Sequence, residues 1–128
     1  MRVVLDTSVF IARETGRAIA QLPPDTETAI SVVTVAELRV GVLIAESSAV
    51  RGRRLSTLET AMRDHQALPV DDSVAEAFAA LVVEVRSAGR NPRVLDSLIA
   101  ATAVAHGAAV ATQDDDFADL PGVAVVRV

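Results

Sequence analysis

The sequence predicts an α/β fold, a three-layer α/β/α sandwich around a five-stranded, mostly parallel sheet. Five short runs rich in Val and Ala alternate along the chain with stretches of helical periodicity. Strands of a parallel sheet that helices cover on both faces read as such short apolar runs. The length of 128 residues and the hydrophobic content of 51% suit one core of ordinary size. We therefore expect residues 1–128 to form a single domain.

The first third of the chain is expected to supply two of the strands. Residues 2–5 are a Val-rich run that Asp6 ends, and the polar residues after it suit the start of a helix over residues 9–14. Gly16 and a Pro-Pro pair interrupt the chain before the second strand, which is expected at residues 29–32.

A helix over residues 33–45 is expected next. Its only polar side chains are those of Thr34, Glu37 and Arg39, so it is apolar nearly all round. Such a helix must be buried on most sides. Complete burial inside the domain and partial burial against another chain both satisfy this requirement.

The middle of the chain predicts two helices around a third strand. Residues 51–64 place Leu55, Leu58 and Met62 on one face and charged residues on the other, which is typical of a surface helix. A brief strand is expected at residues 67–70. Asp72 and Ser73 are then expected to cap a long helix that ends at Gly89.

The last third predicts one helix and two strands. Residues 94–106 are Ala-rich and helical and stop before Gly107. A fourth strand is expected at residues 108–111, a charged turn at 112–117 and a fifth strand at 123–126.

Composition excludes several kinds of chemistry. All twelve basic residues are Arg, so a Walker A phosphate loop and a Schiff-base lysine are excluded. The chain has no Cys, which excludes disulfides, thiolate zinc sites and cysteine nucleophiles. Three Phe are the only aromatic residues besides His, too few for a base-stacking platform. No apolar stretch approaches about 18 residues, and we expect a cytoplasmic protein with no membrane partner.

Acidic residues follow the predicted strands. In open parallel sheets, ligands bind outside the carboxyl ends of the strands. Five acids fall at or near this edge, and without them the chain would have twelve acids and twelve arginines in place of its net charge of −5. They are Asp6, Glu37, Asp96, Asp114 and Asp116.

Each of these acids also has a purely structural interpretation. Asp6 could cap the helix after the first strand. Glu37 stands three residues after Thr34, as in a capping box. Asp96 in a first helical turn would favour the helix dipole, and the acids from Asp114 to Asp116 could form a solvated turn.

Convergence of the acids would instead indicate a metal site. Closely packed carboxylates repel one another and lose hydration unless cations bind among them. Oxygen ligands without His or Cys suit Mg²⁺ or Mn²⁺, and such ions promote phosphodiester hydrolysis. Arginines suit phosphate contacts, and the candidates are Arg13, Arg39, Arg90 and Arg93.

Four segments together resemble the PIN-domain family, and within it the VapC-like toxins of type II toxin-antitoxin pairs. They are VVLDTS at residues 3–8, SVVTVAEL at 31–38, DSLIAATA at 96–103 and TQDDDF at 112–117. The resemblance covers the whole chain and implies the strand order 3-2-1-4-5.

The resemblance also implies a function. Asp6, Glu37, Asp96 and Asp114 match the family's catalytic acids, and Asp6, Asp96, Asp114 and Asp116 are the implied ligands of Mg²⁺ or Mn²⁺. Which of Asp114 and Asp116 is nearer the metal stays open. Hydroxyls that orient the carboxylates match Thr112 and either Thr7 or Ser8.

The family implies an endoribonuclease that a cognate antitoxin holds inactive, and a homodimer, or a heterotetramer or larger assembly with the antitoxin. A carboxylate-metal phosphatase, a DNA nuclease and a non-catalytic PIN-fold binding module are the alternatives.

Overall fold

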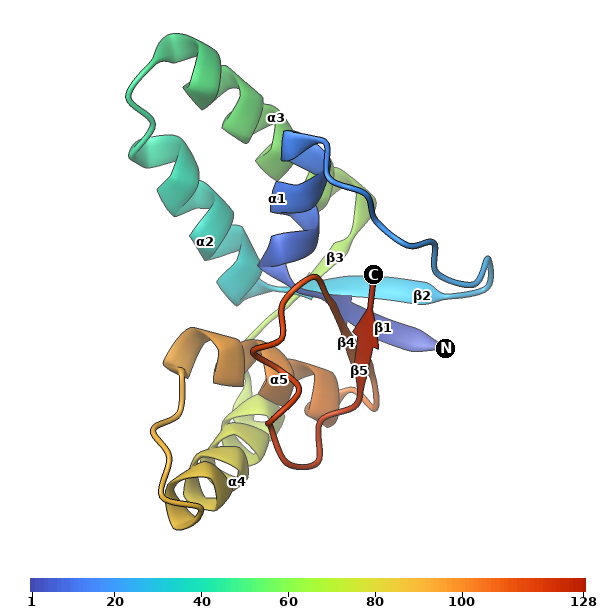
Figure 1. Ribbon diagram of the computed structural model, residues 1–128, viewed down its shortest axis with the longest axis vertical. Coiled ribbons are helices and arrows are strands. Elements are labelled where there is room, and N and C mark those ends of the chain that lie inside the picture. The colour runs from blue at the N-terminus through green and yellow to red at the C-terminus, as the bar shows by residue number, and fades with distance from the viewer.

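A computed structural model describes residues 1–128, and its sheet has the predicted strand order. The strands run in the order β3-β2-β1-β4-β5, and every neighbouring pair is parallel (Figure 1). Their bounds are β1 Arg2–Leu5, β2 Glu27–Ser31, β3 Gln66–Leu68, β4 Ala109–Thr112 and β5 Val125–Arg127. The order reverses between β1 and β4, where a ligand site is expected.

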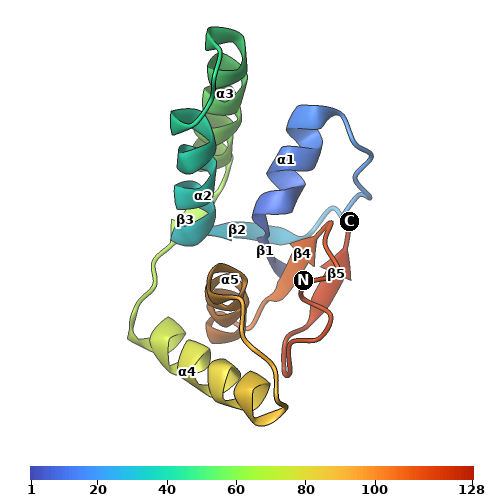
Figure 2. The same cartoon turned by 60° about the vertical axis from the view of Figure 1, so that its left-hand side comes forward.

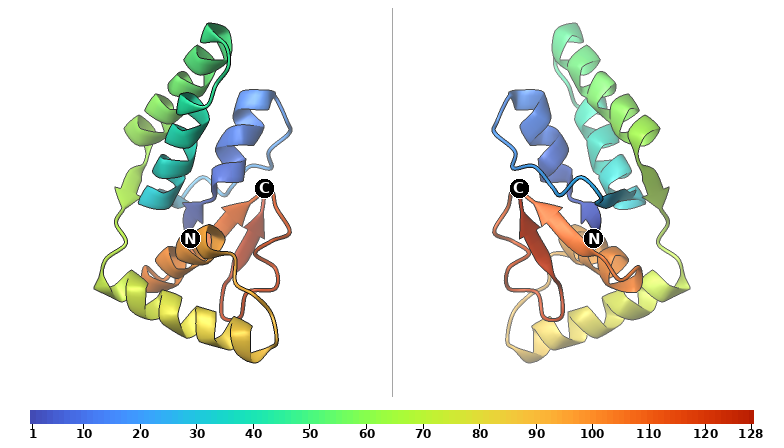
Figure 3. Two further views of the ribbon diagram at one scale, coloured as in Figure 1. Left: turned by 90° about the vertical axis from the view of Figure 1, so that its left-hand side faces the viewer. Right: turned by 90° about the vertical axis from the view of Figure 1, so that its right-hand side faces the viewer.

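Five helices cover the two faces of the sheet, which confirms the three-layer prediction. α1, α2 and α3 lie on one side, and α4 and α5 lie on the other (Figures 2 and 3). Their bounds are α1 Thr7–Thr15, α2 Val32–Leu43, α3 Ser48–Asp64, α4 Asp72–Ser87 and α5 Val94–Ala105. None of these helices is long and apolar enough to cross a membrane.

The alternation of side chains along β1 supplies both halves of the core. Val3 and Leu5 pack with residues of α1, α2 and α3, whereas Val4 packs mainly with residues of α4 and α5. Successive side chains of a strand point to opposite faces, and all three of these side chains are buried. The central strand is therefore apolar from Val3 to Leu5, where helices cover it on both sides, and only Arg2 at its start is exposed.

The element ends differ from the prediction by up to three residues. β3 ends at Leu68 because Pro69 follows, and proline has no N–H to donate to a neighbouring strand. β2 begins at Glu27, which is less apolar than the predicted run, because Glu27 is in register with Arg2 of β1. The ends of these strands depend on pairing with neighbouring strands, and the pattern of apolar residues along the sequence does not reveal that pairing.

The predicted cap of α4 is wrong by one or two residues. The N-cap is Asp71, whose carboxylate accepts a hydrogen bond from the backbone N–H of Val74 at 3.0 Å. Asp72 and Ser73 lie inside the helix. An N-cap residue needs extended backbone, which Asp71 has at φ −96° and ψ −171°.

This cap gives a stability prediction with a matched control. Asp71→Ala is expected to lower the free energy of unfolding by about 1 kcal/mol, because it leaves an N–H of the first turn without a partner. Asp72→Ala is expected to cost less, since that side chain makes no capping hydrogen bond. Urea unfolding of both variants measures the difference, and equal losses would show that Asp71 is not the cap.

Candidate active site

Four acids from separate segments line one pocket at the carboxyl edge of the sheet. Asp6 directly follows β1, Asp114 follows β4, and the other two come from helices α2 and α5. The pocket has a volume of about 210 Å³, and Thr7, Ser8, Ile11 and Arg17 complete its lining. The acids in it are Asp6, Glu37, Asp96 and Asp114. The structure thus brings together four of the five acids that the sequence singled out, and Asp116 is the exception.

Asp6 is buried and fixed on one side only. Its Oδ2 atom accepts hydrogen bonds from Ser8 Oγ at 2.7 Å and from Thr112 Oγ1 at 2.9 Å, and more weakly from the Ser8 backbone N–H at 3.4 Å. The Oδ1 atom accepts none within the chain. Asp6 therefore caps α1 as predicted, and one of its oxygens is left for another partner.

Glu37, on α2, is held by a side chain at the start of α1. Thr7 Oγ1 donates to Glu37 Oε1 at 2.7 Å and also lies 3.0 Å from Thr34 Oγ1. The capping-box interpretation of Thr34 and Glu37 is wrong, because α2 begins at Val32 and its N-cap is Ser31. The helix starts earlier than predicted, so Glu37 lies beyond reach of the cap and points to α1.

The pocket raises the pKa of two of its carboxyls. Burial, and next the charge of Asp6, raise the pKa of Asp96 from 3.8 to about 6, although Arg93 opposes the shift. Burial and the charges of Asp6 and Asp116 likewise raise the pKa of Asp114. Such shifts are expected where carboxylates share a partly desolvated site, and they are typical of functional sites.

Asp115 and Asp116 lie outside this pocket. Asp116 forms an ion pair with Arg93 Nη1 at 2.7 Å, and Arg93 Nε also lies 3.4 Å from Asp96. A neighbouring hollow contains Asp116 and shares Asp96 with the acidic pocket. Asp115 is exposed and pairs with Arg127. Asp114 is thus the member of this acidic run that faces the other three acids.

The donor set suits a hydrated divalent ion. No three His, Cys, Asp or Glu side chains converge closely enough to hold an ion among them. Mg²⁺, however, usually binds through one or two carboxylates and keeps several waters, so a pocket of about 210 Å³ with several carboxylates suits a hydrated ion. Asp6 Oδ1 accepts no hydrogen bond from the chain, and Asp114 makes neither an ion pair nor a side-chain hydrogen bond. These oxygens are available as ligands, and so is Asp96 Oδ1, because Arg93 contacts the other oxygen of that carboxylate.

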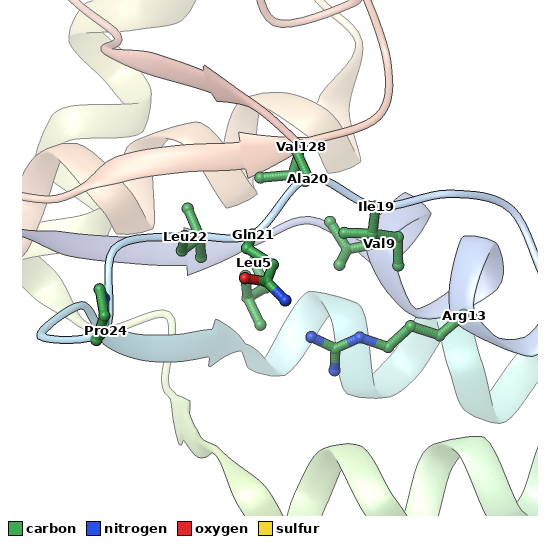
Figure 4. A pocket seen from close by; sticks show the side chains of 9 residues that line it. All are labelled: Leu5, Val9, Arg13, Ile19, Ala20, Gln21, Leu22, Pro24 and Val128. Carbon is green, nitrogen blue, oxygen red and sulfur yellow. The ribbon is translucent and has the colours of Figure 1, made fainter.

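The arginines proposed from sequence are mostly engaged elsewhere. Arg90 pairs with Asp119 and Arg93 with the two acids above. Arg13 lies 5.7 Å above the ring of Phe10 and lines a separate, mainly apolar cavity of about 540 Å³ (Figure 4). Arg39 is exposed and does not line the pocket.

Sequence reasoning missed two residues at the site. Arg17 is the basic side chain that does line the pocket. Gln113 donates its backbone N–H to Ser8 Oγ at 3.0 Å, which ties the loop after β4 to the start of α1. Arg17 belongs to none of the four resembling segments. Gln113 lies in the TQDDDF segment, but its contact with Ser8 depends on how distant parts of the chain meet.

Comparisons with known proteins show the family of the chain. A model of the PIN domain matches residues 3–123. Ribonuclease VapC5 of Mycobacterium tuberculosis is 50% identical over 126 residues, covering 98% of this chain and 92% of that protein. Ribonuclease VapC4 of the same organism is 46% identical over 127 residues, covering 99% and 97%.

Solved structures show the same fold. A crystal structure of VapBC-5, a member of the VapBC family of toxin-antitoxin systems from Mycobacterium tuberculosis, matches with a TM-score of 0.82 and 46% identity, over 99% of this chain and 98% of that chain. FitAcB from Neisseria gonorrhoeae matches with a TM-score of 0.76 and 30% identity, over 98% and 96%. The strand order, the edge that gathers the acids and these similarities together show that the chain belongs to the PIN domain family and, within it, to the VapC-like proteins.

Proposed function

We propose that residues 1–128 form one nuclease domain that cuts RNA internally with a divalent metal, as the toxin of a type II toxin-antitoxin pair. The observation that carries the proposal is the pocket lined by Asp6, Glu37, Asp96 and Asp114. The names of the relatives support RNA as the substrate, because those covering nearly the whole chain are called ribonucleases.

The positions of the acids in the pocket and the family resemblance support the following roles. Asp6, Asp96 and Asp114 would hold Mg²⁺ or Mn²⁺, with Asp116 as a further candidate ligand. When bound, such an ion supplies an activated water and stabilises the leaving oxygen of a phosphodiester.

The hydroxyls of the chain hold the acids in place. Ser8 and Thr112 fix Asp6 through Oδ2 and so aim its Oδ1 atom. Thr7 fixes Glu37 through Oε1 and leaves Oε2 able to accept a proton from the attacking water. In this arrangement the hydroxyls of Thr7, Ser8 and Thr112 each hold a carboxylate. The resemblance alone left Thr7 and Ser8 as alternatives.

Substrate choice tests this proposal against the other chemistries. The purified protein is incubated with RNA, with single- and double-stranded DNA and with a phosphate monoester, each with Mg²⁺ and with Mn²⁺. New internal 5′ ends in RNA alone are the expected result. Release of inorganic phosphate, or cleavage of DNA alone, would replace the proposal by the phosphatase or DNA nuclease, and binding of RNA without any cleavage would favour the non-catalytic module.

We propose that an antitoxin segment covers the exposed end of α2 and reaches the acidic pocket with a basic side chain. Helix α2 and its C-cap leave large apolar side chains in solvent, with 54% exposure at Val40, 72% at Leu43 and 67% at Ile44. Burial of such residues favours association, and a positive charge complements the pocket. The matched crystal structure of VapBC-5 is of a member of a family of toxin-antitoxin systems, which supports an antitoxin as the partner.

A single charge on α2 tests the antitoxin surface. Leu43→Glu is expected to weaken antitoxin binding about tenfold or more, because burying an unpaired carboxylate opposes association. Val104→Glu, which changes a residue with 44% exposure on α5, is the matched control. Calorimetric titration with the cognate antitoxin measures both, and equal affinities for the parent and Leu43→Glu would contradict the proposed surface.

We also propose a homodimer, or a heterotetramer or larger with antitoxin. Helices α4 and α5 leave large apolar side chains exposed near the loop that joins them, at Val83, Val94 and Leu95, and a second copy that packed on these helices would cover them. Light scattering measures the mass, and a monomer at micromolar concentration would exclude a stable dimer.

A further inference from the structure

Arg17 is the one basic side chain among the eight residues that line the acidic pocket. It forms no ion pair within 4.0 Å and no side-chain hydrogen bond, so all the N–H donors of its guanidinium remain available. This sets it apart from the arginines near the neighbouring acids, because Arg93 pairs with Asp96 and Asp116 and Arg127 pairs with Asp115.

The backbone of Arg17 is fixed on both sides although its side chain is free. Gly16 adopts φ +76°, a left-handed conformation that ends α1, and the Arg17 N–H donates to the Ala12 carbonyl at 2.9 Å. The next residue, Ala18, accepts a hydrogen bond at 3.2 Å from the side chain of Gln113.

Gln113 connects this segment to the site. It stands next to Asp114 in the chain, and its backbone N–H donates to Ser8 Oγ. Arg17 is therefore anchored to the same hydrogen-bonded frame that carries Asp6 and Asp114. A free cation on a fixed backbone at the rim of an acidic pocket requires an explanation beyond a mobile surface arginine.

We propose that Arg17 is a substrate-positioning residue that binds a phosphate of the RNA strand next to the one that is cut. The inference rests on the proposed function and deepens it. Carboxylates repel a polyanion, so a strand that enters this pocket needs a cation supplied by the chain as well as any ion held by the acids. The planar fork of guanidinium matches two phosphate oxygens.

Mere compensation of the acidic charge is the competing explanation. The charge of Arg17 does lower the pKa of Asp114. An arginine serving only that purpose would gain most by pairing with a carboxylate, as Arg93 does, and Arg17 forms no such ion pair. If Arg17 only compensated the acidic charge, it would make no direct contact with RNA. The two explanations therefore predict different effects of Arg17 on the affinity for RNA and on its salt dependence.

The test compares Arg17→Gln with Arg13→Gln. Arg13 lies in the last turn of α1, also lacks an ion pair, and lines the mainly apolar cavity of Figure 4 instead of the acidic pocket. In cleavage of a short RNA by the metal-supplied protein, Arg17→Gln is expected to raise KM about tenfold with kcat nearly unchanged, because a flanking phosphate is held equally before and during reaction. Arg17→Lys should recover part of the loss, and Arg13→Gln should behave as the parent.

Salt dependence gives a second readout that needs no turnover. RNA binding is measured on the inactive Asp6→Asn background over a series of salt concentrations. The slope of log affinity against log salt should fall by about 0.7 for Arg17→Gln, the value for one phosphate contact with a single strand. An unchanged KM and an unchanged slope, or equal changes in Arg13→Gln, would overturn the inference. Failure of the parent to cut RNA would count against the proposed function instead, and the slope would still decide the role of Arg17.

Discussion

Replacing Asp6 with asparagine is expected to slow RNA cleavage about a hundredfold or more while the fold is kept. The three hydrogen bonds to Asp6 all meet Oδ2, and the amide oxygen of asparagine can accept them in the same place. The atom that changes is then Oδ1, the oxygen of this pocket-lining residue that accepts no hydrogen bond within the chain. Loss of one anionic ligand misplaces both ion and water, and small displacements are costly for an in-line displacement. Initial rates on an end-labelled RNA measure the effect.

Asp115→Asn is the matched control for Asp6→Asn. It removes one negative charge from the same edge of the sheet, but Asp115 is exposed, pairs with Arg127 and does not line the pocket. We expect its cleavage rate to remain within about twofold of the parent, since surface charges contribute little. Similar losses in both variants would mean that net charge matters and that Asp6 has no special role.

Without metal, Asp96→Asn is expected to be more stable than the parent at neutral pH. The pKa of Asp96 in the folded chain is about 6, above its usual 3.8, so the ionised carboxylate destabilises the fold there. Removing the charge should raise the melting temperature by about 4 °C, which corresponds to roughly 1 kcal/mol at this size. A residue that only favoured the helix dipole would give the opposite sign and lose about 0.3 to 1 kcal/mol.

The pH dependence of this difference has a definite direction. The folded chain holds a proton on Asp96 that the unfolded chain has already released between pH 3.8 and about 6. The contribution of Asp96 to stability is therefore complete below pH 3.8 and is lost as the pH rises to about 6. Melts of the parent and Asp96→Asn should diverge across this window and remain apart above it.

Metal should reverse the order of the two proteins. At a hundredfold excess over its dissociation constant, Mn²⁺ should stabilise the parent by about 2.7 kcal/mol and Asp96→Asn much less. Asp115→Asn serves again as the control and should respond like the parent. If Asp96→Asn is less stable than the parent in chelator and responds equally to Mn²⁺, Asp96 serves the helix and not a metal.

The edge of the sheet that gathers the acids could be predicted from the chain. Asp6 ends an apolar run, and Asp114 follows another, so parallel strands bring them to one edge whatever the exact strand ends are. The four resembling segments added the strand order, which periodicity alone does not contain. The first prediction depends on a local feature, an apolar run followed by an acid, and the second depends on segments that resemble a known family.

Contacts between distant segments were beyond this reasoning. Glu37 fits a capping box by its spacing from Thr34, yet Thr7 from α1 holds its carboxylate. Arg93 was a candidate for phosphate, yet it pairs with Asp96 and Asp116. Arg17 carried no signal, because its place depends on a hydrogen bond between Gln113 and Ala18, 95 positions apart. Each outcome follows from packing, which no single segment encodes.

The central claim is that the acidic pocket cuts RNA with a divalent ion. Removing the metal with a chelator and then restoring it tests this claim most directly. Parent protein and one defined RNA are incubated in excess chelator, and Mn²⁺ or Mg²⁺ is then added beyond the chelator while new 5′ ends are mapped. We predict that the parent produces no new 5′ ends in chelator and specific internal 5′ ends after metal is added. Asp6→Asn should produce none at either stage. The same ends appearing in excess chelator would contradict the account.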